Sequence, residues 1–518
     1  MRARRSGLVV LAMACCAATP TREAFAQSGQ RLAPVGGRTT LVGGTGLVYG
    51  RDSASAFLNP ATTLRIDKNR LSFSVDFYYL SMTRSSAWYQ PGTIDRSRFG
   101  DLGVDGDTAV SAFDFDSLPG SLCLFIGAAD IPLFARTSTA KELRERGARL
   151  GFCLASIQYS AFTYNAEDYE QRRGTTITRQ AHNLRQTFRK LAVGPTYSMY
   201  VDDRISVGAS VHVSRSSHRS MIGATASTDR GVGDGPISSI LYNVARADSH
   251  ELTATVGMLY RISERQTVAL AVQSPSLHLF GSGGLNHHTS FRGGGAGSEE
   301  STFTADGSFV ARSPARVSLG TGLERPWGSV EVNVALHLPM SRAYSAELKG
   351  RALEVTDDGR AREQPRSATL STRALGAVNF GVGGEVFTSP GLSLLGGFGT
   401  DISIVPKGTL PNDPLNYYPS RMHRLALSFG VGSHGQGGDL LIGVEGSYGW
   451  GERLTPNMYR LPPRLDIADQ QQLGLLFVLA GSTSFRSIKR TVDTIKKAVE
   501  PEPAKKEPER RDATEPTK

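Results

Sequence analysis

The sequence Ile-Ser-Val-Gly-Ala-Ser-Val-His-Val-Ser occupies residues 205–214. Apolar side chains at the odd positions alternate with small or polar ones at the even positions, and this period of two predicts a β-strand with one apolar and one polar face. A tilted strand needs about 9–11 residues to cross the hydrocarbon core of a membrane, and this stretch is long enough. It therefore favours a strand whose apolar face contacts lipid.

The same alternation returns along the chain, in segments of similar length. Examples are residues 71–79, 330–338, 440–450 and 473–485. Some of these segments end in an aromatic residue, such as Tyr79 or Trp450. Aromatic residues at strand ends are typical of the interfacial girdles of membrane barrels.

The connections between these segments alternate between short and long. Tight turns are predicted at 201–204, 262–265, 325–328, 388–391 and 433–438, and long polar loops near 84–118, 166–187, 219–248, 281–302, 340–366, 405–420 and 451–469. Outer-membrane barrels have short periplasmic turns and long outer loops. We predict an all-β fold, a transmembrane antiparallel barrel of about 14 strands over residues 69–485 with both termini in the periplasm. A short helix is expected at 139–146.

The N-terminus predicts export. Residues 1–26 have a basic start, an apolar run and an Ala-Phe-Ala site, as in a secretory signal peptide. The alternative is a lipoprotein signal with Cys15 lipidated. Both place the chain outside the cytoplasm, and with the barrel pattern they predict the outer membrane of a Gram-negative bacterium. The low hydrophobic fraction of 39% and the 57 glycines agree with strands that have a polar face.

Two of the four cysteines, Cys123 and Cys153, lie beyond the predicted signal peptide. They fall on strands that we expect to be neighbours in an oxidising compartment. Because the helical insertion between them leaves their register uncertain, we expect two separate buried thiols rather than a disulfide.

Residues 44–61, Gly-Thr-Gly-Leu-Val-Tyr-Gly-Arg-Asp-Ser-Ala-Ser-Ala-Phe-Leu-Asn-Pro-Ala, begin like a dinucleotide-binding loop. The glycine spacing is one residue too wide, and Pro60 prevents a long helix after Gly50, so nucleotide binding is disfavoured. The segment 27–68 is rich in small residues, and a barrel of this size has a lumen wider than side chains alone fill. We predict that residues 27–68 form a hatch that plugs the lumen.

These features resemble the FadL family of outer-membrane transporters for long-chain fatty acids and aromatic hydrocarbons. Residues 46–61 resemble the family's hatch signature, in which Asp52, Asn59, Pro60 and Ala61 match. The passages 197–210, 260–275 and 314–320 follow in the order the family has. The chain departs from the family in its helical insertion, in the sequence of residues 394–398 and in its long charged tail.

The resemblance implies passive uptake of a hydrophobic molecule through a groove among the outer loops and a hatch-closed interior, without catalytic residues, metal or cofactor. Our candidate groove residues are Trp88, Tyr89, Phe280 and Phe291. The strand register predicts that polar side chains face the lumen and hydrate or bond the hatch: Asp76, His212, Glu331, His337 and Glu445.

The alternative function is a structural, assembly or secretion-associated barrel without transport activity. An enzyme is disfavoured because the chain has no G-x-S-x-G nucleophile motif. A basic group within residues 172–190 is expected to meet lipopolysaccharide phosphates. The composition of the tail, residues 486–518, predicts a short helix followed by a disordered segment. Contact with a periplasmic partner is one role that we consider for this tail. Nucleic acid is not expected as a partner, since no basic and aromatic platform recurs.

Overall fold

The computed structural model describes residues 27–28, 35–66, 69–86, 108–110, 114–131, 139–173, 176–229, 236–293, 297–407, 421–435, 437–458 and 463–485. The strands of its main sheet are β2 (Arg70–Ser86), β3 (Thr108–Val110), β4 (Asp114–Gly127), β5 (Arg149–Arg173), β6 (Thr176–Tyr200), β7 (Ile205–Asp229), β8 (Ile237–Arg261), β9 (Gln266–Gln273), β10 (Leu277–Arg292), β11 (Ser298–Ala311), β12 (Arg316–Arg325), β13 (Gly328–His337), β14 (Met340–Val355), β15 (Ala361–Ala374), β16 (Ala377–Ser389), β17 (Leu392–Asp401), β19 (Arg421–His434), β20 (Gly438–Asn457) and β21 (Arg464–Ser484). Two short strands, β1 (Gln27–Ser28) and β18 (Ser403–Ile404), pair with each other.

The main sheet closes into an antiparallel barrel of 14 strands, as the sequence predicted. Its circuit runs β2, β4, β5, β6, β7, β8, β9, β12, β13, β16, β17, β19, β20 and β21, and β21 pairs back onto β2. None of the helices in the described part of the chain is long and apolar enough to cross a membrane.

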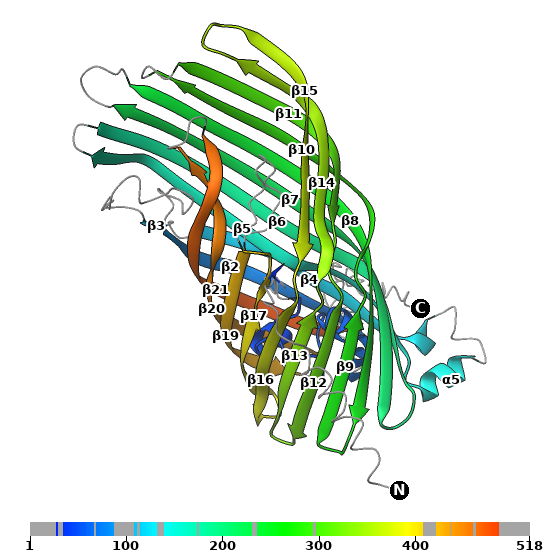
Figure 1. Cartoon of the computed structure of the whole chain (residues 1–518). Helices are drawn as coiled ribbons and strands as arrows, with labels where there is room; N and C mark the ends of the chain where they lie inside the picture. The colour runs from blue at the N-terminus through cyan, green and yellow to red at the C-terminus, as the bar shows by residue number, and fades with distance from the viewer. Residues whose placement is uncertain are drawn as a thin grey trace, which may run out of the picture.

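Half of the barrel wall is much taller than the rest. Strands β5 to β8 are 25 residues long each, and β10, β11, β14 and β15 continue the sheet beside them (Figure 1). We call this extension the tall wall. The predicted loops at 166–187, 219–248, 281–302 and 340–366 are therefore wrong for most of their length, because these residues extend strands beyond the apolar belt.

Four strands of the circuit are interrupted where the tall wall begins. The interruptions separate β9 from β10, β12 from β11, β13 from β14 and β16 from β15. Three of them contain a proline, namely Pro275, Pro314 and Pro339. Proline cannot donate to the ladder of hydrogen bonds, so each one ends the regular pairing at this height.

The other end of the barrel has short connections, which match the predicted turns. The longest described one carries the short helix α5 (Thr139–Glu145), so the helical insertion expected at 139–146 is confirmed. It lies beside the ends of β5 and β6 (Figure 1).

The outer face of the barrel carries a continuous apolar belt, and the inner face is polar. In β7 the side chains of Val211 and Val213 are exposed, whereas Ser210, His212 and Ser214 are buried inside. Large exposed side chains continue round the circuit at Val256, Leu319, Val334, Phe380, Leu427, Phe429, Ile442 and Phe477. Exposed apolar residues of this density contact lipid.

Cys123 and Cys153 are joined by a disulfide, so our expectation of separate thiols is wrong. The two residues lie directly opposite each other in the ladder between β4 and β5. The insertion that carries α5 sits in the connection between these strands and leaves their register intact.

Candidate functional site

The described part of the hatch, residues 35–66, lies inside the barrel and contacts its inner face. It contains two short helices, α2 (Gly37–Leu41) and α3 (Ser55–Leu58), and the 3-10 helix η1 (Pro60–Arg65). Pro60 is the first residue of η1, where a missing N–H costs nothing. Nearly all residues of this segment are buried.

Glu331 of β13 holds the middle of the hatch by its backbone. Its Oε1 accepts hydrogen bonds from the amides of Gly46, Leu47 and Val48 at 2.8, 2.7 and 3.1 Å, and its Oε2 accepts from the amide of Tyr49 at 2.9 Å. Four successive N–H groups converging on one carboxylate form an anion-binding nest. The carboxylate is 3% exposed, so these bonds are shielded from water.

A second anchor joins α2 to β16. Arg38 donates from Nε and Nη2 to Oε2 of Glu385 at 3.0 and 2.9 Å, and from Nη1 to the carbonyl of Tyr49. Both charged side chains are buried, so removing Glu385 leaves the charge of Arg38 uncompensated, whereas Glu385 also lies 3.2 Å from Nε2 of His434. This ion pair fixes the hatch to β16. The neighbouring strand β13 carries Glu331, so the two anchors lie on adjacent strands.

Asp52 folds the hatch onto itself. Its carboxylate accepts from the amide and hydroxyl of Thr39 at 2.9 and 3.1 Å and from the amide of Ala54 at 3.1 Å. Burial raises the pKa of Asp52, and the hydrogen bonds from Thr39 act in the opposite direction. Burial also raises the pKa of Tyr49 to about 12. Asp52 thus connects α2 to the turn before α3.

Asn59, Pro60 and Ala61 pack against glycines of the barrel wall. Asn59 donates to the carbonyl of Leu47 at 2.7 Å and accepts from the amide of Ala61 at 3.1 Å. Asn59 also donates from Nδ2 to the carbonyl of Met258 in the wall, over a longer distance of 3.5 Å. A Cβ atom on Gly257 would lie 1.8 Å from Asn59 Oδ1.

Other parts of the hatch rest on glycines in the same way. Gly208, which faces Gly257 across β7 and β8, lies under Pro60 and Ala61. Gly430 and Gly443, opposite each other on β19 and β20, lie under Leu41. Gly383 and Gly397, opposite each other on β16 and β17, lie under Val42 and Gly43. We call these three facing pairs the glycine seat.

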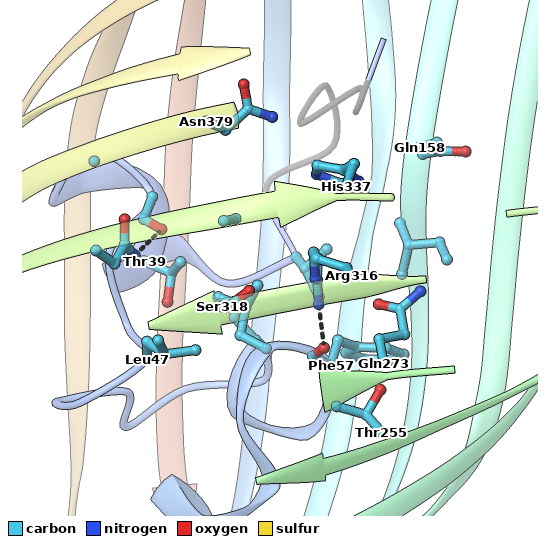
Figure 2. Close-up of a pocket in the computed structure, with 18 of the residues that line it drawn as sticks. Thr39, Leu47, Phe57, Gln158, Thr255, Gln273, Arg316, Ser318, His337 and Asn379 are labelled. Atoms are coloured by element: carbon cyan, nitrogen blue, oxygen red, sulfur yellow. Dashed lines mark hydrogen bonds between the residues drawn. The ribbon is translucent and has the colours of Figure 1, made fainter. Parts of the chain in front are cut away.

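A cavity of about 230 Å³ lies on the tall-wall side of the hatch. Arg316 of β12 reaches into it and donates from Nη2 to the carbonyl of Phe57 at 3.0 Å (Figure 2). Within the described part of the chain Arg316 forms no ion pair. Apolar side chains that line the same cavity are Leu47, Phe57, Leu58, Ile157, Ile404 and Leu476.

Two further cavities lie at the short-turn end of the hatch. One, of about 280 Å³, is lined by Arg51, Arg70 and Asp439, and the other, of about 170 Å³, by Arg204 and Glu264 among others. Arg65 of η1 lines both. Residues of the segment 35–66 therefore line the cavity on the tall-wall side and both cavities at the opposite mouth.

Lys190 and Glu251 form a buried ion pair beside the proline interruptions. Lys190 Nζ lies 2.8 Å from Glu251 Oε2 and 2.6 Å from the hydroxyl of Ser313. Glu251 also accepts from Ser216 and Ser276. Ser276 lies between β9 and β10, and Ser313 lies between β11 and β12. The side-chain network therefore links strands at the height where backbone hydrogen bonds of the sheet are missing.

The structure distributes the predicted site residues over different places. His212 and His337 line the cavity beside Arg316, with His212 stacked on Phe57 at 4.3 Å between ring centroids, and Glu445 lines it from the opposite side. Trp88 and Tyr89, and the side chain of Asp76, lie outside the described residues.

The two remaining groove candidates do not come together. Phe280 is 62% exposed on the outer face of β10, where it stacks on His250, and Phe291 is buried on the inner face of the same strand. Phe280 and Phe291 therefore do not line one groove together, and the groove predicted from these two residues with Trp88 and Tyr89 stays a prediction. Sequence analysis also missed Arg316 and Glu385, because both lie in strands whose inward faces we did not search for charge.

No family model and no curated protein matches the sequence. Solved structures match its fold. A FadL homologue of Pseudomonas aeruginosa is 16% identical, with 89% of this chain and 100% of that chain covered and a TM-score of 0.50. The toluene transporter TodX of Pseudomonas putida is 14% identical, with 88% and 99% covered and a TM-score of 0.55.

The protein therefore has the fold of the FadL-type outer-membrane barrels. The fold that the sequence resemblance implied is confirmed by these likenesses, which extend over most of the chain.

Proposed function

We propose that this protein is an outer-membrane transporter for the passive uptake of hydrophobic molecules such as long-chain fatty acids or aromatic hydrocarbons. The observation that carries the proposal is the cavity on the tall-wall side of the hatch, which combines an apolar lining with the guanidinium of Arg316. The toluene transport named for TodX agrees with this class of ligand.

The chemistry of the cavity favours an amphipathic anion. Leu47, Phe57 and Ile157 offer apolar contact, for which a water-filled porin lumen has no equivalent. Arg316 keeps donors that the bond to Phe57 does not use, and a guanidinium pairs with a carboxylate through two parallel hydrogen bonds. A fatty acid satisfies both parts of the site, whereas an aromatic hydrocarbon uses only the apolar part.

The proposal assigns the tall wall to the cell exterior and the short turns to the periplasm, as in other barrels of this kind. Both termini are then periplasmic, with residues 1–26 removed as a signal peptide and the tail, 486–518, free to meet a periplasmic partner. The hatch, residues 27–68, closes the path between the outer cavity and the periplasmic mouth, so uptake requires it to move or to leave a lateral exit.

The test is uptake of labelled oleate and labelled toluene by cells that depend on this protein. Arg316→Gln removes the guanidinium charge from the cavity, and Arg325→Gln, at the far end of the same strand β12, is the matched control. Since a hydrogen bond to a charged group contributes about 1.5–3 kcal/mol, we expect the half-saturating oleate concentration to rise about tenfold or more, with toluene uptake unchanged.

Equal oleate uptake by Arg316→Gln and the wild type would show that the fatty acid does not pass through the cavity beside Arg316. Uptake of neither probe by the wild-type protein would contradict transport and favour a structural or assembly role for the barrel.

A further inference from the structure

Arginines gather on the outer face of the barrel just beyond the apolar belt. They are Arg185 and Arg189 of β6, Arg215 and Arg219 of β7, and Arg246 of β8. We call them the arginine patch. The burial pattern places each of them on the outward side of its strand, opposite the buried residues that face the interior.

Strand register aligns the patch with the edge of the belt. Val193, Val213 and Leu252 form the last row that is apolar on all three of the strands β6, β7 and β8. The next outward row contains Arg215, and the one after it contains Arg189. A step of two residues advances about 7 Å along a strand, so the patch begins at the level where acyl chains end.

The patch continues for two more rows. Arg219 faces Arg246 across β7 and β8, and Arg185 lies one row further from the belt. From Arg215 to Arg185 the patch therefore rises by about 20 Å along the strands. Facing like charges repel each other. An anion bound between Arg219 and Arg246 would offset this repulsion and stabilise the wall at this height.

Asp248 orients two of the arginines without neutralising the patch. Its Oδ1 accepts from Arg215 Nη2 at 3.1 Å, and its Oδ2 accepts from Arg219 Nη2 at 2.7 Å. The arginine side chains are still 55% and 47% exposed. Asp306, on β11, borders the patch at Gly284, so the five arginines face two carboxylates.

Arg189 has a further unused donor. Its Nε is buried and has no hydrogen-bond partner among the residues that the structure describes. A buried unpaired donor is costly, and an oxyanion seated on the wall would satisfy it.

We propose that the arginine patch is a binding site for the phosphate groups of lipopolysaccharide, the glycolipid of the outer leaflet. Its acyl chains lie against the apolar belt below the patch, and its phosphorylated sugars rise beside the arginines. A phospholipid places one phosphate at a single height, which matches only the row of Arg215. A glycolipid with phosphates at several heights matches the depth of the patch, and arginine forks suit phosphate geometry.

The inference corrects the sequence-based assignment of the basic residues at 172–190. Lys190 points inward and is paired with Glu251, so it is not available to lipid. Of that basic stretch, Arg185 and Arg189 belong to the patch, and the arginines of β7 and β8 complete the site. The inference rests on the orientation that we propose for the barrel and does not depend on transport.

The test measures binding of rough-type lipopolysaccharide to the purified full-length protein in detergent. The double variant Arg215→Gln/Arg219→Gln removes two charges from the patch. The matched control, Arg204→Gln/Arg261→Gln, removes two charges at the other end of β7 and β8. We expect the patch variant to bind about tenfold more weakly and the control to bind within about twofold of the wild type. Heat-dependent gel mobility verifies that both variants form barrels.

The same titration with phosphatase-treated lipopolysaccharide should weaken wild-type binding to the level of the patch variant. Three results would overturn the inference: an equal loss in both variants, undiminished binding of the dephosphorylated lipid, or binding of phosphatidylglycerol as tight as that of lipopolysaccharide. Loss of oleate uptake with intact lipopolysaccharide binding would contradict only the transport proposal. If cysteine labelling on cells places the tall wall in the periplasm, the patch cannot meet lipopolysaccharide in the outer leaflet. The inference would then fail even if the purified protein binds the lipid in detergent.

Discussion

Replacing Glu331 should release the hatch while leaving the barrel folded. Glu331→Ala removes the acceptor for four buried amides, those of residues 46–49. A buried donor left without a partner costs about 1–3 kcal/mol. Four donors at the low end of that range cost on the order of 4 kcal/mol, which is about a thousandfold in the equilibrium between docked and released hatch.

Glu331→Gln is the graded variant. The glutamine oxygen can still accept from residues 46–48, but its NH₂ group would face the amide of Tyr49, so one bond is lost and the charge is removed. We expect a smaller release than in Glu331→Ala. Glu324→Ala is the control, since Glu324 also pairs with hatch arginines but is 41% exposed, and exposed pairs contribute about 0–1 kcal/mol.

The assay is conductance of single barrels in a planar bilayer. The wild type and Glu324→Ala should stay closed to ions, Glu331→Gln should open in brief steps, and Glu331→Ala should remain open for most of the recording. Thermal unfolding, followed by gel mobility, separates hatch release from loss of the barrel. Equal conductance in Glu331→Ala and Glu324→Ala would refute the reasoning, because the four hydrogen bonds would then contribute no more than a surface ion pair.

The remaining predictions concern the glycine seat, the orientation and the belt. Gly257→Ala should displace the hatch and raise conductance, because its Cβ would meet the hatch asparagine at 1.8 Å, whereas a Cβ at Gly446 has 3.9 Å of space and Gly446→Ala should leave conductance unchanged. A cysteine at Ala361, on the tall wall, should react with a membrane-impermeant reagent on intact cells, and one at Gly437 should not. The reverse result would show that the tall wall faces the periplasm. Val444→Arg should lower the free energy of unfolding by about 2–4 kcal/mol in a refolding titration, and no loss would place Val444 away from lipid.

The period of two was sufficient to predict a barrel, because lipid and lumen impose the alternation on its strands, and the alternation of short and long connections gave the strand number. It failed for the tall wall. There the outer face mixes polar residues such as Arg215 and Arg219 with apolar ones such as Ile240, so the contrast between the two faces weakens and the sequence resembles a loop. The inner face still carries apolar residues such as Ile222 and Leu241. Their two-residue period was the available signal that these strands continue beyond the apolar belt.

The candidate site was less predictable, since it depends on contacts between the hatch and distant strands. Glu331 was correctly expected among the inward residues, but no local pattern indicates that it meets residues 46–49. The disulfide was missed for the same reason: whether Cys123 faces Cys153 depends on a register that the connection between them does not specify. Glycines at inward positions of the strands, such as Gly208 and Gly257, were a usable sign of a close backbone approach.

The position of the hatch also bears on the order in which the barrel is assembled. Residues 66–69 are all that separate η1 from β2, the strand that closes the circuit with β21. The hatch touches that seam directly, since Gly37 packs on Ala480 of β21 and Leu41 on Gly443 of β20. We therefore expect the hatch to dock as the seam forms, so that insertion of the N-terminal segment and closure of the barrel proceed at a single rate when each is followed by its own probe.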